Sequence, residues 1–336
     1  MQAGLVAARV QAIRYEAKGI VSVELVPLES GAFHSFTAGS HVDLHLPNGV
    51  VRSYSLCNPA GETRRYQIAV AHDRASRGGS RFVHEQLRVG ATIRISPPRN
   101  HFPLVESAPH HVLVAGGIGI TPLWCMFQRL VAIGASVDLV YCSRSRHEAA
   151  FADAIEALAE GAGRGDAATG GGGGGRRASV RFLHDDREGG PPDLNALLGE
   201  APPDAHVYCC GPAPMLEAFE AACARLGLAH AHVERFAARE QAHPSIARDA
   251  FVVVCARSDR SVEVASGETI LDKVLAAGIH ADHSCREGVC GACETTVIEG
   301  SVDHRDSLLS DQERAAGKTM MICCSLAAGE RLVLDL

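Results

Sequence analysis

The sequence predicts a multidomain protein of α/β plus β architecture: an antiparallel β-barrel, then an α/β domain, then a small β-grasp domain. Three observations lead to this expectation. Short strand patterns follow one another up to about residue 104, an apolar run at 111–115 leads through glycines into a helix pattern, and cysteines cluster between residues 285 and 293. The expected domains are residues 1–104, 105–236 and 249–336, with a polar linker at 237–248.

Length, composition and charge argue against several classes of protein. A chain of 336 residues with 46% hydrophobic residues can build two or three packed cores. The formal net charge is −7 and no long basic stripe is present, which argues against a nucleic-acid partner. The longest apolar run, residues 112–127, is too short to span a bilayer, and no signal pattern opens the chain. We therefore expect a cytoplasmic monomer without a membrane partner, whose twelve cysteines are thiols or metal ligands.

The first 104 residues have the strand spacing of a small antiparallel barrel. The expected strands are residues 42–46, 50–57, 66–71 and 91–96. Residues Pro47 to Gly49 have the composition of a hairpin turn between the first two. One helix pattern, residues 80–87, lies among the strands.

The turn before this helix, Arg77-Gly78-Gly79-Ser80, has the composition of an anion site. Gly78 and Gly79 free the backbone, Ser80 is expected to cap the helix, and free N–H groups at a helix start attract phosphate. Arg77 adds a charged fork. Taken alone, the turn fits a capped surface helix better than a phosphate site.

A second group lies on the expected strand 50–57. Arg52 and Tyr54 would share one face of it, and Ser53 and Ser55 the other, because side chains alternate along a strand. By its pattern alone this is an ordinary strand.

A glycine-rich turn joins a strand to a helix in the second domain. Residues 111–115 have the continuous apolar pattern of a buried parallel strand, and residues 123–131 that of a helix. The turn between them contains Gly116, Gly117, Gly119, Thr121 and Pro122. We expect Thr121 to cap the helix and Pro122 to take its first position. A pyrophosphate docks at such a turn, although the spacing is not that of G-x-G-x-x-G.

Further strands and helices complete the α/β domain: strands at 137–142, 180–183 and 206–209, and helices at 148–160 and 216–226. Cys210-Gly211-Pro212 form a turn before the last helix, and Cys209 is expected inside the strand. Ser143, Arg144 and Arg146 could contact a 2′-phosphate or form a solvated turn. The glycine-rich stretch 161–175 should be a disordered loop, to which we assign no function.

The C-terminal part contains the cysteine cluster within a β-grasp pattern. The expected elements are a hairpin at 251–265, a helix at 269–277, strands at 294–298 and 331–336, and a capping box from Ser310 to Glu313.

Cys285, Cys290 and Cys293 have the spacing C-x4-C-x2-C, and Cys323 follows at the distance typical of a [2Fe–2S] site of the plant-type ferredoxins. Glycines between the ligands would allow a loop that aims N–H groups at sulfur. A zinc site, a C-x-x-C redox pair and a disulfide are alternatives, but zinc sites usually have two matched cysteine pairs.

Cys323 and Cys324 are adjacent in an expected strand, residues 320–325, so only one of them could face the other cysteines. The spacing from Cys293 selects Cys323 as the fourth ligand.

Together, Arg52-Ser-Tyr-Ser55, the turn at 77–80 and Pro98-Arg-Asn-His-Phe102 resemble the phthalate dioxygenase reductase family, which includes vanillate O-demethylase reductases. The resemblance implies that FMN binds to the barrel through residues 52–55 and 77–80. Arg52 and the turn would hold the phosphate, Tyr54 would pack on the isoalloxazine, and Ser55 would reach its N5 edge. Residues 98–102 would close the barrel beside the flavin.

The second domain resembles ferredoxin-reductase-like NAD(P) domains in its GGxGxTP loop, residues 116–122. The resemblance places Cys210, Gly211 and Pro212 beside the nicotinamide and Phe236 against the flavin, and it favours NADH. A buried core position is an equally good interpretation of Phe236.

Three such sites in one chain imply an electron route from NADH through FMN to the cluster. A nicotinamide gives two electrons as hydride, whereas a [2Fe–2S] cluster passes one at a time, and a flavin does both. In the resembled family the acceptor is the Rieske centre of an aromatic-ring oxygenase. One alternative is a non-enzymatic zinc or regulatory protein with a ferredoxin-like domain. Another is an FAD- or FMN-dependent reductase of a different mono-oxygenase or a cytochrome.

Overall fold

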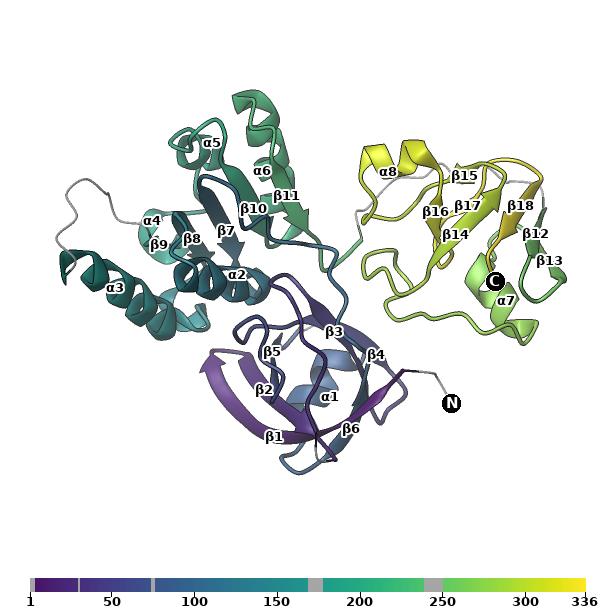
Figure 1. The fold of residues 1–336 in the computed structure, drawn as a ribbon, viewed down its shortest axis with the longest axis horizontal. Helices are drawn as coiled ribbons and strands as arrows, with labels where there is room; N and C mark the ends of the chain where they lie inside the picture. The colour runs from purple at the N-terminus through teal and green to yellow at the C-terminus, as the bar shows by residue number, and fades with distance from the viewer. Residues whose placement is uncertain (1–3, 30, 74–75, 169–177, 239–249) are drawn as a thin grey trace. The chain divides into compact units, whose positions relative to one another are not determined.

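The computed structural model describes residues 4–29, 31–73, 76–168, 178–238 and 250–336 (Figure 1). They form two compact units, which divide between Glu234 and Arg235. In these residues no helix has the length and apolar character needed to cross a membrane. The predicted linker, residues 237–248, lies almost wholly outside the described residues.

The first unit begins with a six-stranded antiparallel sheet in the order β4-β3-β6-β1-β2-β5 (Figure 1). A bridge between Leu56, which follows β4, and Ile68 in β5 joins the two edges, so the sheet closes into the predicted barrel. The strands are β1 (Val6–Ala17), β2 (Ile20–Pro27), β3 (His41–His45), β4 (Val51–Ser55), β5 (Tyr66–Ala71) and β6 (Thr92–Ile95).

The short helix α1 (Gly79–Glu85) starts differently from the prediction. Its N-cap is Gly78, at a φ of 96°, and no side chain caps it. Ser80 lies inside the helix, where its Oγ accepts the Asp73 N–H at 3.2 Å. The Oγ of Ser76 accepts the N–H of Arg81 at 3.3 Å. The expected Ser80 cap is therefore wrong.

The α/β part of the first unit is a five-stranded parallel sheet in the order β11-β10-β7-β8-β9. Its strands are β7 (His111–Gly116), β8 (Val137–Ser143), β9 (Ala178–His184), β10 (His206–Cys210) and β11 (Ala231–Glu234). The longer helices are α2 (Ile120–Ala132), α3 (Ala152–Ala168) and α6 (Ala213–Leu226). The shorter ones are η1 (Gly117–Gly119), η2 (Arg146–Glu148), α4 (Asp185–Glu188) and α5 (Leu194–Leu198).

Helix α3 corrects the expectation for the glycine-rich stretch. It begins later than predicted and continues to Ala168, so residues 161–168 are helical rather than a loop. The remaining glycines lie outside the described residues.

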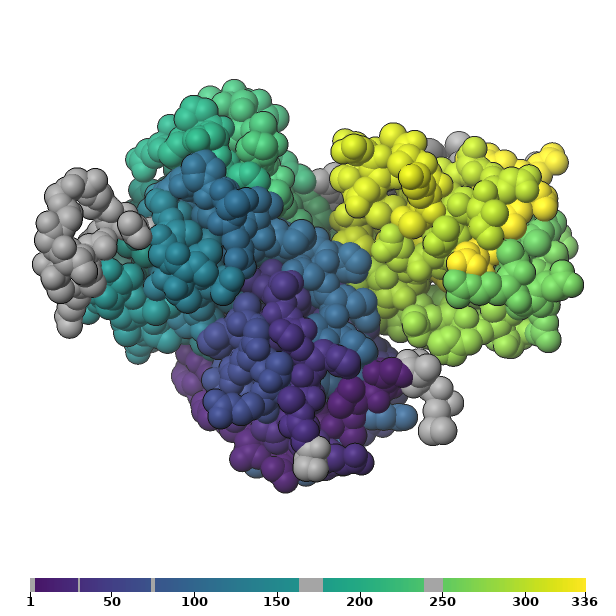
Figure 2. All heavy atoms as spheres, viewed as in Figure 1, coloured from purple at the N-terminus to yellow at the C-terminus, as the bar shows by residue number. Residues whose placement is uncertain are grey.

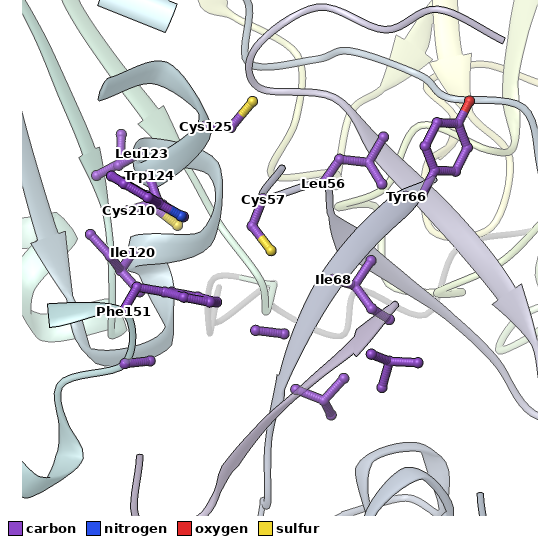
Figure 3. Packing of buried hydrophobic residues seen from close by; sticks show 14 of the residues in the cluster. Leu56, Cys57, Tyr66, Ile68, Ile120, Leu123, Trp124, Cys125, Phe151 and Cys210 are labelled. Atoms are coloured by element: carbon purple, nitrogen blue, oxygen red, sulfur yellow. The ribbon is translucent and has the colours of Figure 1, made fainter. Parts of the chain in front are cut away.

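One apolar core connects the barrel to the α/β sheet (Figure 3). Leu56 and Ile68 of the barrel belong to the same buried cluster as Leu123 and Trp124 of α2. The amide of Gln128 in α2 donates to the carbonyl of Cys57 at 3.0 Å. This shared core fixes the barrel against the end of the parallel sheet at which α2 begins.

The second unit has its own core and is shown in light green to yellow in Figure 2. Its main sheet has the order β13-β12-β18-β14-β16, and β15 pairs with β17. Its strands are β12 (Phe251–Cys255), β13 (Arg260–Val264), β14 (Glu294–Glu299), β15 (Val302–Asp303), β16 (Thr319–Met321), β17 (Leu326–Ala327) and β18 (Arg331–Leu334). Its helices are α7 (Ile270–Ala276) and α8 (Asp311–Ala316), and α8 carries the predicted Ser310–Glu313 capping box.

Candidate functional site

Two glycine-rich loops meet at the carboxyl edge of the parallel sheet. Strands β7 and β10 are neighbours, and the strand order reverses between them, which is where α/β sheets bind ligands. A Cβ on Gly119 would lie 2.1 Å from the carbonyl oxygen of Cys210. A Cβ on Gly116 would lie 2.5 Å from Met215 Sδ and 2.8 Å from Pro212 Cδ. The two loops therefore pack backbone against backbone at this contact, with no room for a side chain at Gly116 or Gly119.

Thr121 and Pro122 do not have the predicted positions at the helix start. Helix α2 begins at Ile120, so Pro122 is its third residue. Thr121 is buried, and its hydroxyl donates to the carbonyl of Ile118 at 3.1 Å rather than capping the helix. Gly117 has a φ of 54°, a conformation that glycine adopts without strain.

Three side chains from three strands meet around one carboxyl group. Ser55 ends β4, Cys210 ends β10 and Glu234 ends β11. The Ser55 hydroxyl lies 3.5 Å from Glu234 Oε2, and the Cys210 Sγ lies 3.9 Å from the same oxygen. The structure therefore brings together Ser55 and Cys210, which the resemblance places at the flavin and at the nicotinamide.

The electrostatics of this trio favour its protonated forms. Burial raises the pKa of Glu234 to about 8. Burial, and after it the charge of Glu234, raises the pKa of the Cys210 thiol well above its usual range. Near neutral pH the trio can therefore hold protons while carrying little net charge.

The sequence alone did not predict a role for Glu234. The signal was its place at the carboxyl end of the last strand, beside the reversal of strand order.

Arg52 packs against the predicted phosphate turn. A Cβ on Gly79 would lie 2.6 Å from Arg52 Cγ, so only glycine fits beside this side chain. The guanidinium of Arg52 donates to the carbonyls of Arg77 at 3.3 Å and Val51 at 2.7 Å. Arg52 and the 77–80 turn therefore form one cationic corner, with N–H groups of α1 beside it.

The other predicted flavin residues lie on the same strand or next to it. Burial raises the pKa of Tyr54 to about 12, so its phenol is neutral at physiological pH. Ser53 donates to Asp43 Oδ1 at 2.5 Å on the opposite face from Arg52. Arg99 exchanges backbone hydrogen bonds with His41 at 2.8 and 3.0 Å, which attaches residues 98–102 to the barrel.

Phe236 is 46% exposed, and the interpretation as a buried core phenylalanine is therefore wrong. It belongs to the segment that opens the second unit. An exposed aromatic ring remains available to a ligand.

The predicted cluster cysteines form two contacting pairs in the second unit. The Cys285 side chain contacts that of Cys290, and the Cys293 side chain contacts that of Cys323. Cys290, Cys293 and Cys323 are buried, whereas Cys285 is half-buried. Among the described residues no three His, Cys, Asp or Glu side chains gather around a single metal ion. The Cys324 side chain also contacts that of Cys323, so the choice of a two-iron cluster over one tetrahedral zinc rests on the spacing of the four cysteines.

The backbone of this loop also fits a cluster. The N–H of Glu287 donates to Cys285 Sγ at 3.3 Å, and the N–H of Cys285 donates to Cys290 Sγ at 3.5 Å. Gly288 and Gly291 have φ values of 69° and 70°. Glycine at these positions allows the sharp path that points N–H groups at sulfur, as the sequence predicted.

Cys323 and Cys324 lie in a turn rather than on the predicted strand. Strand β16 ends at Met321, and residues 322–324 form a turn in which the N–H of Cys324 donates to the carbonyl of Met321 at 3.2 Å. The alternation of strand faces therefore does not apply. The assignment of Cys323 now rests on its spacing and on its contact with Cys293, and it stays a prediction.

Arg146 is already engaged by other side chains. It donates to both carboxylate oxygens of Glu156 at 2.8 and 2.9 Å and to Asp153 at 2.6 Å. Its guanidinium also lies 5.0 Å from the ring centre of Phe182. The Ser143 hydroxyl donates to the carbonyl of Ser145 at 3.0 Å.

Comparisons with known proteins identify two domains in the chain. Residues 113–221 match the oxidoreductase NAD-binding domain, and residues 253–328 match the 2Fe-2S iron-sulfur cluster binding domain. A phenoxybenzoate dioxygenase subunit beta from Ectopseudomonas oleovorans is 48% identical, over 98% of this chain and 97% of its own length. A tetrachlorobenzoquinone reductase from Sphingobium chlorophenolicum is 48% identical, over 95% of this chain and 94% of its own.

The structure of a phthalate dioxygenase reductase, described as modular for electron transfer from pyridine nucleotides to [2Fe-2S], is also similar. It matches with a TM-score of 0.68 and 33% identity, over 99% of this chain and 98% of that chain. The chain therefore belongs to the phthalate dioxygenase reductase family and is an NAD-dependent iron–sulfur flavoprotein oxidoreductase.

Proposed function

We propose that this protein is the reductase component of a Rieske-type aromatic oxygenase or demethylase, and that it carries electrons from NADH through FMN and a [2Fe–2S] cluster. The observation that carries the proposal is the meeting of Ser55 and Cys210 at Glu234. This contact joins the strand expected to bind flavin to the loop expected to bind nicotinamide, and the cysteine pairs lie in the same chain.

Each group of residues has a separate task in this proposal. A bound flavin would supply the chemistry that links two-electron hydride transfer to single-electron transfer. Arg52 and the 77–80 turn hold the flavin phosphate, and Tyr54 packs on its ring. Ser55 donates a hydrogen bond at the edge where hydride arrives, Cys210 closes the nicotinamide crevice, and Glu234 holds a proton beside both. Cys285, Cys290, Cys293 and Cys323 hold the cluster.

NADH is the proposed donor rather than NADPH. Two arginines follow β8. Arg146 is neutralised by Glu156 and Asp153. Arg144 lies beside the acidic helix α4, where its carbonyl accepts the Asp186 N–H at 3.1 Å. The neighbouring helix α4 adds Asp185, Asp186 and Glu188, which repel phosphate. Steady-state rates with both nucleotides test this: we expect kcat/KM to be higher for NADH, and a preference for NADPH would overturn it.

FMN is the proposed flavin. Heat release followed by chromatography identifies it, and recovery of FAD would show that residues 52–55 and 77–80 hold a different cofactor from the one proposed. The proposed site of action is the cytoplasm, since none of the twelve cysteines, all within the described residues, forms a disulfide.

The acceptor separates this proposal from its alternatives. The name of the phenoxybenzoate dioxygenase relative favours an oxygenase as the electron acceptor. The name of the tetrachlorobenzoquinone reductase relative favours a quinone as the acceptor. A different mono-oxygenase or a cytochrome is the third alternative. The purified protein with NADH should support aromatic turnover by a Rieske oxygenase. Rapid quinone or cytochrome reduction, with no turnover by any Rieske oxygenase supplied, would refute the oxygenase role.

A further inference from the structure

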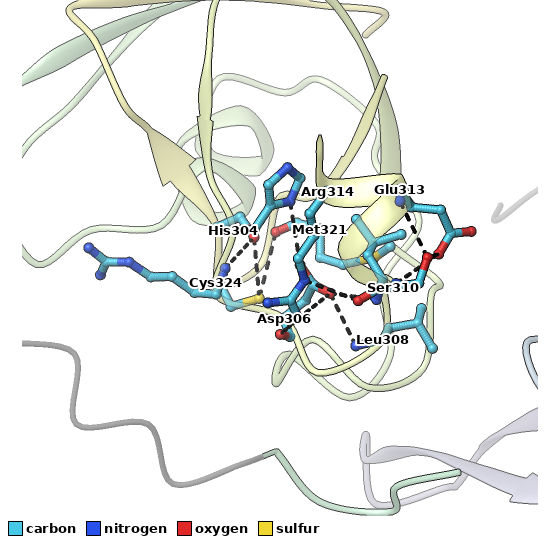
Figure 4. Close-up of polar contacts among 11 residues, drawn as sticks. His304, Asp306, Leu308, Ser310, Glu313, Arg314, Met321 and Cys324 are labelled. Atoms are coloured by element: carbon cyan, nitrogen blue, oxygen red, sulfur yellow. Dashed lines mark hydrogen bonds and ion pairs between the residues drawn. The ribbon is translucent and has the colours of Figure 1, made fainter. Parts of the chain in front are cut away.

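A carboxylate that no predicted role explains lies fully buried in the second unit. The Asp306 side chain has no exposed surface, and it follows β15 in the segment before α8. A buried charge destabilises a protein unless it is paired and hydrogen-bonded. Its Oδ2 accepts the N–H groups of Leu308 at 3.1 Å and Leu309 at 2.7 Å (Figure 4).

Arg314 of α8 supplies the compensating charge. Its Nη2 lies 3.6 Å from Asp306 Oδ2 and donates to the Asp306 carbonyl at 2.6 Å. Its Nε donates to the carbonyl of Leu309 at 3.0 Å. The carboxylate and the guanidinium together therefore fix the turn from residue 306 to 309.

The other carboxylate oxygen points to a histidine rather than to a hydrogen-bond donor. Asp306 Oδ1 lies 3.6 Å from His304 Nδ1 (Figure 4). Within the described residues, Oδ1 and both ring nitrogens of His304 are buried without a hydrogen-bond partner. Buried polar atoms without hydrogen-bond partners lower the stability of the folded protein, so this arrangement needs an explanation other than stability.

The fixed turn is in direct contact with the cysteine loop. The N–H of Ser307 donates to the carbonyl of Gly288 at 2.9 Å. A Cβ on Gly288 would lie 2.8 Å from Asp306 Cα and 2.5 Å from Cys324 Sγ. Gly288 lies between Cys285 and Cys290, so the Asp306 turn clamps the loop between two predicted iron ligands.

We propose that Asp306 is a positioning residue for the iron–sulfur cluster: its turn holds the cysteine loop at Gly288, and its buried charge, balanced by Arg314, helps to set the cluster's reduction potential. The proposal rests on the proposed function only in taking the cluster to be present. A fixed negative charge near a cluster disfavours the added electron, and the low-dielectric interior strengthens this effect.

Asp306→Asn tests the charge of Asp306 separately from the hydrogen bonds that hold its turn. The amide oxygen can still accept the two N–H groups, but the negative charge is lost. Asp303→Asn is the matched control, because Asp303 lies three residues earlier and pairs with Arg305 at 2.8 Å but is not fully buried. Midpoint potentials of the purified full-length proteins are measured by redox titration monitored by electron paramagnetic resonance.

We expect Asp306→Asn to keep the cluster absorbance and to raise the potential. At a fixed potential the ratio of reduced to oxidised cluster should rise at least tenfold, which corresponds to about 59 mV for a one-electron couple. Asp303→Asn should change this ratio less than twofold. Asp306→Ala, which also removes the acceptor, should lose its cluster to a chelator at least tenfold faster than the wild type.

Arg314→Gln should shift the reduction potential in the opposite direction to Asp306→Asn. It leaves the carboxylate and removes the compensating charge, so the potential should fall, whereas Arg305→Gln should leave it unchanged. Unchanged potentials in Asp306→Asn or, where that variant does not fold, in Arg314→Gln would overturn the electrostatic part. If Asp306→Ala loses its cluster no faster than the wild type, the claim that the Asp306 turn holds the cysteine loop is wrong. A wild-type protein that never binds a cluster would instead refute the proposed function.

Discussion

At the residue scale, Glu234 carries a carboxyl whose pKa differs between the folded and unfolded protein across neutral pH. Burial raises its pKa from 4.5 to about 8, so the folded protein holds this proton more tightly than the unfolded chain. Its contribution to stability is complete below about pH 4.5 and is lost as the pH rises through about 8.

Glu234→Gln should therefore flatten the dependence of stability on pH. Between pH 5 and 8 the free energy of unfolding of the first unit should lose up to about 1.4 kcal/mol per pH unit in the wild type, and much less in the variant. Urea unfolding at several pH values measures both. Glu85→Gln, at an exposed position in α1, is the control and should keep the wild-type slope. An unchanged slope in Glu234→Gln would show that the carboxyl is ionised in the folded protein.

Arg77 tests the proposed flavin phosphate site. Arg77→Glu places a negative charge beside Arg52 and the start of α1, where phosphate is expected, so flavin should be lost. Flavin absorbance per protein after purification measures this. Arg81→Glu makes the same charge change at the third residue of α1, outside the 77–80 turn, and should retain more flavin. Undiminished flavin in Arg77→Glu would contradict the assignment.

At the element scale, the loops after β7 and β10 approach each other so closely that no side chain fits at Gly119. Gly119→Ala would force a Cβ against the carbonyl of Cys210, 2.1 Å away, so the loops must separate. We expect KM for NADH to rise at least tenfold with flavin content unchanged. Gly161→Ala in α3 meets no atom within 4 Å and should instead add about 0.5–1 kcal/mol of stability. Nearly unchanged NADH kinetics in Gly119→Ala would show that this contact is not at the nicotinamide site.

The turn at 322–324 decides which of two adjacent cysteines binds iron. Cys323→Ala should abolish the visible spectrum of the cluster, because Cys323 contacts Cys293. Cys324→Ala should keep that spectrum, at a stability loss within about 0.5–3 kcal/mol. Absorption spectra of both variants settle the choice, and the reverse result would assign the iron to Cys324.

Sequence patterns predicted the repetitive elements well and the contacts between them less well. The glycines at 116–119 and 288–291 could be predicted as loop residues because they have positive φ values or leave no space for a side chain. The prediction for the start of α1 was wrong because Ser76 and Ser80 carry the same hydroxyl group. Only the fold decides that Ser76 accepts an N–H of the helix, from Arg81, while Ser80 accepts the N–H of Asp73. Glu234, which is half-buried, and Asp306, which is fully buried, could not be found from local patterns, because partners from other segments surround each carboxyl group.

At the scale of the whole molecule, the two units have separate cores. The proposed flavin and nicotinamide residues up to Glu234 lie in the first unit, and the four proposed iron ligands lie in the second. Such independence predicts that each half-reaction can be observed without the other.

A chain ending near Ala238 tests the electron route most directly. It keeps the first unit whole and removes every proposed iron ligand. With NADH it should still reduce ferricyanide at close to the full-length rate, while reduction of the oxygenase should be lost. Oxygenase turnover supported by the truncated chain would make the flavin the terminal donor and would contradict the proposed route through the cluster.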